Sequence, residues 1–169
     1  MDQNVIYSAD YFIKELNMIP HQEGGFYKES FLSSESLELE SKLLWTSIYF
    51  LLRDGEVSNF HRLKSDEMWY YHAGSSLTIY MINLDGELIT QELGLDTNRG
   101  EKPQVLVPKG YIFGSAMNHE GYALVGCMVS PGFDFKEFEL FKRNVLLELY
   151  PQYETIIHRL TKEDIGVSM

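Results

Sequence analysis

The sequence has little cysteine and few basic residues, and both shortages exclude classes of protein. Cys127 is the only cysteine among 169 residues, so the chain can form no internal disulfide and contains no CxxC metal motif. The apolar flanks in ALVGCMV predict that this thiol is buried in a strand. Lysine and arginine number 14 against 25 aspartates and glutamates, giving a formal net charge of -11. This charge disfavours nucleic acid and anionic membranes as partners, and its simplest consequence is solubility.

Long apolar runs are also missing. No stretch reaches the roughly 20 apolar residues that cross a bilayer as a helix, so we expect no membrane partner. The beginning, MDQNVIYSADYF, lacks a basic segment followed by an apolar one, which predicts no signal peptide and a cytoplasmic location. The length favours one domain over residues 1–169. Hydrophobic residues make up 44% and aromatic residues 14%, enough for a sizeable core.

Helical patterns lie near the two ends of the chain. Ser8 can cap a helix in ADYFIKELNM, which we expect to end before Pro20. Asp134 and Glu137 form a capping-box pattern, and Pro151 is expected to start a last helix. After the capping box, apolar residues recur at helical spacing and should pack on the rest of the domain as one stripe: Phe138, Phe141, Val145 and Leu149.

Between residues 42 and 130 the pattern is that of short β-strands. The segments LLWTSIYFLL, VSNFHRL, EMWYYH, SLTIYMINL, ELITQEL, QVLVP, YIFGSAM and YALVGCMV are separated by turn signals. Among these turns, Asp85-Gly86 is a strong hairpin signal. Earlier, the Gly24-Gly25 pair indicates a bend or bulge at the entry to another strand. Such closely spaced strands are typical of a sandwich or a barrel.

The stretch GEVSNFHRLKSDEMWYYHAG places polar side chains among aromatic ones. Strand alternation gives two sets that each share one face: Asn59, His61 and Leu63, and Glu67, Trp69 and Tyr71. The short turn between these strands predicts a hairpin that brings His61 close to Glu67. Such a pair can be half of a metal site, a general base with its orienting carboxylate, or a structural pair that satisfies two buried groups.

The spacing in this stretch resembles the first motif of the cupin superfamily, which in metal-binding members supplies two histidines and one glutamate as ligands. His61 occupies the first histidine position and Glu67 the glutamate position, whereas Leu63 stands at the second histidine position. The second cupin motif carries a histidine after Pro-x-Gly, and here PKGYIF ends in Phe113. Two of the four usual ligands are therefore replaced by hydrocarbon, and we expect no metal and no other cofactor.

Further segments resemble a cupin family of unknown function with an RmlC-like jelly roll: HQEGGFYKESF, TSIYFLL, LVPKGYIFGSA and LVGCMVSPGFDFKEFEL. The resemblance extends from about Leu16 to Pro151. It implies a mainly β fold, a double-stranded β-helix (cupin jelly-roll barrel) with a short N-terminal helix and C-terminal helices. It also implies a homodimer, but it brings no reaction with it.

Three functions remain open for the barrel cup. The first is binding of a small polar, ring-containing metabolite, for which the expected contacts are His21, Glu23, Gly24, Gly25, Asn59, Leu63, Trp69, Phe113 and Phe133. The second is a metal-independent isomerase or epimerase for a sugar-like or nucleotide-sugar substrate, in which His61 abstracts a proton, Glu67 orients His61 and Tyr71 returns a proton. The third is a metal-dependent cupin in which His21 or Glu23 adds a ligand.

The segment around Gly24 forms either a pocket rim, in its own or a neighbouring subunit, or a bulge at the barrel edge.

Overall fold

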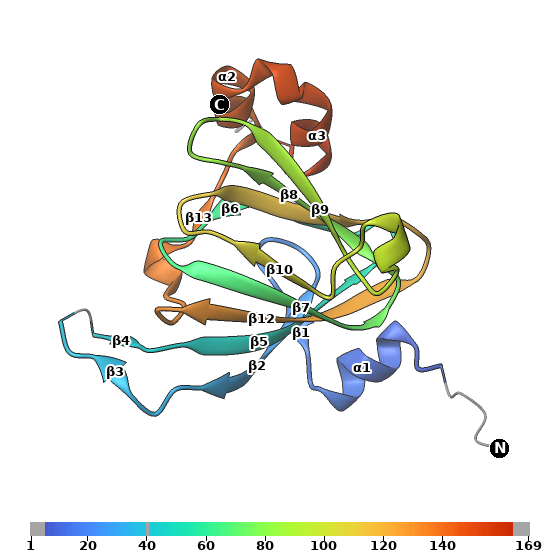
Figure 1. The fold of residues 1–169 in the computed structure, drawn as a ribbon, viewed down its shortest axis with the longest axis vertical. Helices are drawn as coiled ribbons and strands as arrows, with labels where there is room; N and C mark the ends of the chain where they lie inside the picture. The colour runs from blue at the N-terminus through green and yellow to red at the C-terminus, as the bar shows by residue number, and fades with distance from the viewer. Residues whose placement is uncertain (1–5, 40, 164–169) are drawn as a thin grey trace, which may run out of the picture.

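Two antiparallel β-sheets face each other in the computed structural model, which describes residues 6–39 and 41–163 (Figure 1). One sheet has the strand order β1-β2-β5-β12-β7-β10, and the other has the order β13-β6-β11-β8-β9. The strands are β1 (Ile19–Pro20), β2 (Phe26–Leu32), β3 (Ser36–Leu37), β4 (Lys42–Leu43), β5 (Thr46–Arg53), β6 (Val57–Arg62), β7 (Asp66–Gly74), β8 (Leu77–Ile82), β9 (Leu88–Leu93), β10 (Gln104–Val107), β11 (Ile112–Met117), β12 (Tyr122–Ser130) and β13 (Glu139–Leu140). The predicted jelly-roll architecture is confirmed.

The helices lie outside this pair of sheets. They are α1 (Ala9–Glu15), α2 (Arg143–Leu149) and α3 (Glu154–Arg159), with short 3-10 turns η1 (Thr97–Arg99), η2 (Phe135–Glu137) and η3 (Pro151–Tyr153). As predicted, the Ser8 hydroxyl caps α1, accepting a hydrogen bond of 3.1 Å from the backbone N–H of Tyr11. Within the described residues, no helix combines the length and apolar character needed to cross a bilayer.

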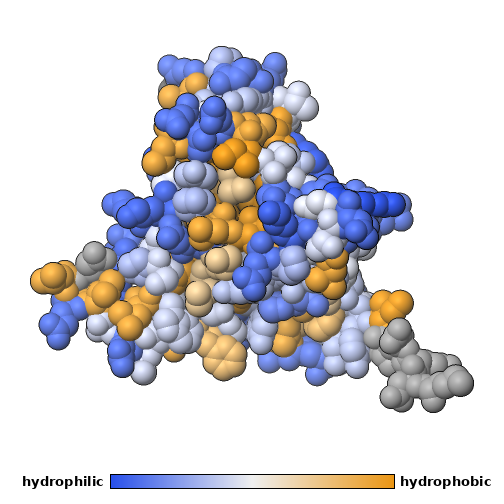
Figure 2. Space-filling view, in the orientation of Figure 1, coloured by the Kyte–Doolittle hydropathy of each residue, from blue (hydrophilic) through white to orange (hydrophobic). Residues whose placement is uncertain are grey.

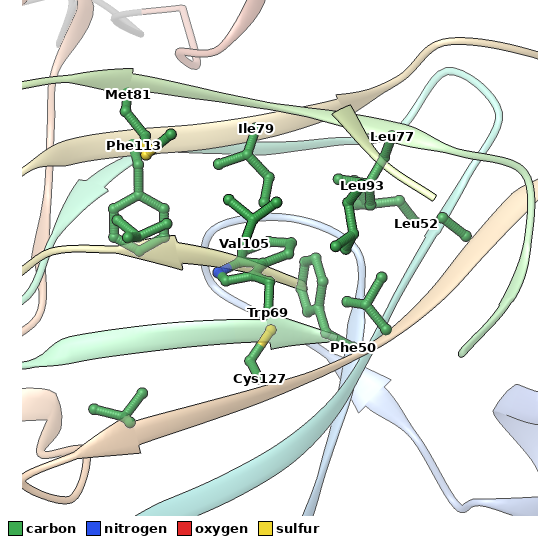
Figure 3. Packing of buried hydrophobic residues seen from close by; sticks show 14 of the residues in the cluster. Phe50, Leu52, Trp69, Leu77, Ile79, Met81, Leu93, Val105, Phe113 and Cys127 are labelled. Carbon is green, nitrogen blue, oxygen red and sulfur yellow. The ribbon is translucent and has the colours of Figure 1, made fainter. Parts of the chain in front are cut away.

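The main core fills the space between the two sheets (Figure 3). Trp69 lies in its middle, with ring-centroid distances of 5.9 Å to Phe50 and 6.4 Å to Phe113 in edge-on arrangements. Cys127 is buried in β12, as its apolar flanks predict. A second core joins the five-stranded sheet to the C-terminal helices, where Leu146, Ile157 and Leu160 pack on Phe60, Ile82 and Ile112.

Strands β3 and β4 form a two-stranded sheet of their own, which extends away from the two larger sheets (Figure 1). Figure 2 shows hydrophobic residues gathered over this part of the surface. The exposed large ones in and beside the hairpin are Phe31, Leu32 and Leu39.

The predicted C-terminal stripe is only partly right. Asp134 caps only the short 3-10 turn η2 and not a longer helix. The chain then forms β13, which pairs with β6, before α2 begins at Arg143. Because this pairing interrupts the helix, the later residues change phase relative to the core. Phe141 is buried as expected, but Val145 and Leu149 are 40% and 56% exposed. The residue of α2 that enters the core is Leu146.

The predicted hairpin between the strands carrying His61 and Glu67 is wrong. β6 pairs with β11 and β13, whereas β7 pairs with β12 and β10, so the two strands belong to different sheets. Residues 63–65 cross from one sheet to the other. Alternation identified the correct face of each strand but could not identify its hydrogen-bonded neighbours.

Candidate functional site

A cavity of about 290 Å³ lies between the six-stranded sheet, β6 and the segment that follows β12. Its aromatic walls are Tyr27, Phe50, Trp69, Phe133, Phe135 and Phe138. Three buried carboxyl or imidazole side chains also border it: Glu23, His61 and Glu67. Buried titratable groups in a largely apolar pocket are a common feature of binding and catalytic sites.

The tight turn between β1 and β2 brings His21 and Glu23 to this cavity. The backbone N–H of Gly24 donates to the carbonyl of His21 at 3.1 Å, and the N–H of His21 donates to the carbonyl of Gly25 at 2.9 Å. Gly24 has a φ of +117°, and a Cβ there would lie 2.0 Å from the carbonyl oxygen of Val57. Only glycine allows this backbone to approach β6 so closely. The predicted bend is therefore confirmed, and it forms a wall of its own chain's cavity.

Asn59 fastens this turn to β6. Its backbone N–H and its side-chain Nδ2 both donate to the carbonyl of Glu23, at 2.7 and 2.8 Å. The carboxylate end of Glu23 is held as well, because Oε1 accepts a hydrogen bond of 2.9 Å from the hydroxyl of Ser58. The position of Glu23 is thus fixed at both ends.

Glu23 and His61 share a single proton. His61 Nδ1 lies 2.7 Å from the carbonyl oxygen of Asn59, and because a carbonyl can only accept, Nδ1 carries a hydrogen. His61 Nε2 lies 3.1 Å from Glu23 Oε2. Burial lowers the pKa of His61 to about 4, against a rise from the Asn59 hydrogen bond, and burial raises the pKa of Glu23. A neutral His61 with its hydrogen on Nδ1 can only accept at Nε2, so a hydrogen bond between the two side chains is donated by the Glu23 carboxyl.

His21 completes this side of the cavity as a neutral imidazole. Its Nδ1 accepts a hydrogen bond of 3.1 Å from the backbone N–H of Glu23, so the hydrogen of the neutral ring is on Nε2. Burial lowers the pKa of His21, although the neighbouring Glu23 acts in the opposite direction. Its ring meets that of Tyr27 edge-on with centroids 4.6 Å apart.

Glu67 faces the cavity from β7 without a comparable set of partners. Its side chain is buried, and its Oε2 has no hydrogen-bond partner among the described residues. Burial raises the pKa of Glu67 to about 8, and the nearby carboxyl of Glu23 adds to this rise. The Trp69 indole opposes the rise, yet its N–H forms no regular hydrogen bond. Near neutral pH, Glu67 is therefore mostly protonated.

The predicted contact between His61 and Glu67 is not formed. Both side chains line the cavity, but the polar contacts of His61 are with Asn59 and Glu23. Glu67 therefore does not orient His61, and this expectation is corrected. The partner comes from a turn far away along the sequence, which strand alternation cannot reveal.

Tyr71 lies outside the cavity, which corrects its expected role as a proton donor there. It is four residues beyond Glu67 on β7, a distance of about 13 Å along a strand. Its hydroxyl donates to the carbonyl of Gly74 at 2.6 Å. It thus fastens the far end of β7.

The expected ligand contacts divide into two groups. Five of them border the cavity: His21, Glu23, Leu63, Trp69 and Phe133. The other four support these walls and do not border the cavity: Gly24, Gly25, Asn59 and Phe113. Phe113 lies against the imidazole of His61, with ring centroids 4.1 Å apart. The structure thus places these four beside the cavity walls rather than in them.

Sequence reasoning missed several residues of the site. Ser58 binds Glu23, and Ile48, Phe135 and Phe138 line the cavity. Ile48 belongs to a strand that is apolar on both faces, so the sequence does not show which of its residues face the cavity. The serine next to Asn59 and His61 was also uninformative, because its partner depends on how the β1–β2 turn docks.

The donor atoms present do not fit the metal centre of the resembling motif. Among the described residues, no group of three or more His, Cys, Asp or Glu side chains is arranged to hold a metal ion. Leu63 and Phe113 occupy the two replaced ligand positions and are 5% and 1% exposed. The Nε2 of His61, which would face a metal, faces Glu23 instead.

Comparison with known proteins identifies relatives of this chain. A family model described as the cupin superfamily (DUF985) matches residues 10–141. An uncharacterised protein of Saccharomyces cerevisiae is 28% identical over 154 residues, which cover 80% of this chain and 76% of that protein.

Solved structures show the same similarity. A protein from Shewanella oneidensis is 58% identical with a TM-score of 0.91, covering 94% of this chain and 100% of the other. A hypothetical protein from Leishmania major is 39% identical with a TM-score of 0.87, covering 93% and 100%. Oxalate decarboxylase from Bacillus subtilis is 16% identical with a TM-score of 0.56, and the match covers 97% of this chain but 41% of that enzyme. This last similarity indicates a shared fold only.

Proposed function

Because this chain belongs to the DUF985 family of the cupin superfamily, we propose that its barrel cup binds a small ring-containing metabolite without a catalytic metal. The observation that carries this proposal is the cavity of about 290 Å³, in which aromatic walls surround two buried carboxyls and a buried imidazole. An apolar cavity of about 150 Å³ can hold benzene, so this one has room for a ring with a side group.

The polar groups of the cavity supply direction to such a ligand. The Nε2–H of neutral His21 can donate a hydrogen bond, and the carboxyl of Glu67 can accept or donate according to its protonation. A few polar groups among apolar walls are what a small-molecule site needs for orientation. The tight fastening of Glu23 by Ser58 and Asn59 makes this side of the cup preformed.

A cavity-filling variant tests the binding function. We expect native mass spectrometry of untagged protein to show a bound small molecule, or thermal-shift screening of cyclic metabolites to show stabilisation by several degrees. Ile48→Trp should fill the cavity and abolish either signal, because Ile48 lines it with an apolar side chain. Ile89→Trp is the matched control, since Ile89 is an exposed isoleucine on β9. Equal binding by the wild type and Ile48→Trp would contradict the proposal.

A second candidate function is metal-independent proton transfer on a sugar-like or nucleotide-sugar substrate, as in an isomerase or epimerase. The observation that favours it is the buried contact of 3.1 Å between His61 Nε2 and Glu23 Oε2. In this version Glu23, rather than Glu67, is the partner of His61, and Tyr71 has no part. For this reaction Nε2 of His61 must exchange its contact with Glu23 for the substrate, because Nδ1 is engaged by the carbonyl of Asn59. Nε2 would then accept the proton next to the substrate carbonyl, and return of a deuteron from solvent would label the substrate. NMR detects that exchange, and persistence of full exchange in His61→Ala would exclude this mechanism.

Elemental analysis tests the remaining metal-dependent alternative. Since the donor set does not fit a metal, we expect less than stoichiometric transition metal in untagged protein. A stoichiometric metal that His61→Ala removes would instead establish a rearranged metal centre.

A further inference from the structure

The carboxyl of Glu67 differs from that of Glu23 because its Oε2 has no hydrogen-bond partner among the described residues. Glu23 binds Ser58 and His61, and His61 binds Asn59. The side chain of Glu67 is only 7% exposed and borders the cavity, and its Oε2 is fully buried without a partner among the described residues. A buried polar group without a partner costs free energy, so this carboxyl indicates a place where a ligand group binds.

The overall charge of the protein favours a positive ligand. Burial favours the protonated forms of the lining carboxyls of Glu23 and Glu67, and the exposed Lys28 and Glu29 at the cavity carry opposite formal charges. Burial keeps the two lining imidazoles neutral. The whole chain carries a formal charge of -11, which attracts cations and repels anions at a distance. An anionic ligand would approach against this field.

The walls of the cavity also suit a cation. Six aromatic side chains border a space large enough for one ring, and the faces of such rings attract organic cations. Trp69 stands two residues from Glu67 on the same face of β7, and its unpartnered indole N–H is oriented to favour the ionised form of that carboxyl. An ionised Glu67 would therefore have a donor from the protein on one side and a place for a second donor in the cavity.

We propose that the metabolite bound in the cup is an organic cation, whose protonated nitrogen pairs with Glu67 while its ring packs on the aromatic walls. This inference rests on the proposed binding function and specifies its ligand class: an amine attached to, or part of, a small ring system. The charge-assisted hydrogen bond gives this carboxyl a partner that the described residues do not supply. Glu23 keeps its own partners and does not contact the nitrogen.

Three probes of similar size and different charge test this inference: benzylammonium, benzyl alcohol and benzoate. Isothermal titration calorimetry at roughly pH 8 should show benzylammonium binding at least about tenfold more tightly than benzyl alcohol, with benzoate weakest. Glu67→Gln should lower the affinity for benzylammonium by about tenfold or more and change that for benzyl alcohol by less than about twofold. Glu148→Gln is the control, because it removes the same charge from the exposed surface of α2.

The outcomes separate the ligand class from the binding function. The inference of a cationic ligand fails if benzyl alcohol or benzoate binds the wild type as tightly as benzylammonium, or if Glu67→Gln retains full affinity for benzylammonium. In either case the proposed binding of a ring in the cup is unaffected. If none of the three probes binds the wild type, the cup does not bind small aromatic rings and the proposed function fails too. The comparison of probes on the wild type holds even if Glu67→Gln does not fold.

Discussion

The two sides of the cup differ in how completely their polar groups are satisfied. On the β1–β2 side, Glu23 is bound by Ser58 and Asn59 and shares a proton with His61. On the β7 side, the Oε2 of Glu67 and the indole N–H of Trp69 have no hydrogen-bond partners among the described residues. A satisfied buried network makes a structure rigid, whereas an unsatisfied group indicates where another molecule completes the bonding. We infer that the first side is a preformed wall and that the second side receives the ligand.

Gly24→Ala should break the preformed side with the largest effect. The new Cβ would lie 2.0 Å from the carbonyl oxygen of Val57, and φ is +117°. We expect the free energy of unfolding to fall by about 3 kcal/mol or more, measured in urea. Gly55→Ala is the control, because φ is +77° there but nothing lies within 4 Å of the new Cβ. Gly55→Ala should lower the free energy of unfolding by about 1 kcal/mol. Equal losses would show that the turn is not closely docked on β6.

Replacement of Glu23 distinguishes the shared proton from a simple ion pair. Glu23→Ala removes the partner of both Ser58 and His61, and we expect a loss of about 2 kcal/mol in urea unfolding. Glu23→Gln should cost less than about 1 kcal/mol, because the amide can donate to His61 Nε2 as the protonated carboxyl does, while its oxygen accepts from Ser58. If Glu23→Gln loses as much unfolding free energy as Glu23→Ala, the pair is instead an imidazolium at His61 and a carboxylate at Glu23.

Glu67→Gln should change the pH dependence of stability. Because the pKa of Glu67 is raised to about 8 in the folded protein, that protein binds more protons than the unfolded chain between about pH 4.5 and 8. The contribution of the Glu67 carboxyl to the free energy of unfolding is fully present at low pH and is lost as the pH rises towards 8. The wild type should therefore lose stability relative to Glu67→Gln over this range, by up to about 1.4 kcal/mol for each pH unit. Parallel curves from urea unfolding at several pH values would show that the carboxyl is not buried as described.

Tyr71→Phe should have the smallest effect. It removes one hydrogen bond to the carbonyl of Gly74, and we expect a loss of about 1 kcal/mol or less in thermal unfolding. Benzylammonium affinity should stay within about twofold of the wild type, because Tyr71 does not border the cavity. A large loss of benzylammonium affinity without a loss of stability would show that Tyr71 takes part in ligand binding.

The sequence predicts the fold of this protein better than its site. Alternating strands, the Asp85-Gly86 turn and the Gly24-Gly25 bend are local signals, and each appears in the structure where expected. Strand alternation also identified the inward faces that carry His61 and Glu67. These features could be predicted because each depends on residues close together in the chain.

The parts that failed depend on contacts between distant segments. Alternation does not say which strands are neighbours, so the β6–β7 hairpin was a wrong prediction. The partner of His61 is Glu23, which reaches it only because the β1–β2 turn docks on β6. Likewise, Phe138 enters the cavity rather than a helix, since the chain after it pairs with β6. Each of these outcomes is decided by tertiary packing.

A carbon-13 NMR titration of the two buried carboxyls tests the difference between the two sides most directly. The Glu67 carboxyl should titrate near pH 8 in the free protein, and its pKa should fall when benzylammonium is added, because a bound cation favours the ionised form. The resonance of Glu23 should keep the same titration with and without the probe. A Glu67 pKa that benzylammonium leaves unchanged, or a fall confined to Glu23, would contradict the assignment of Glu67 as the group that receives the ligand.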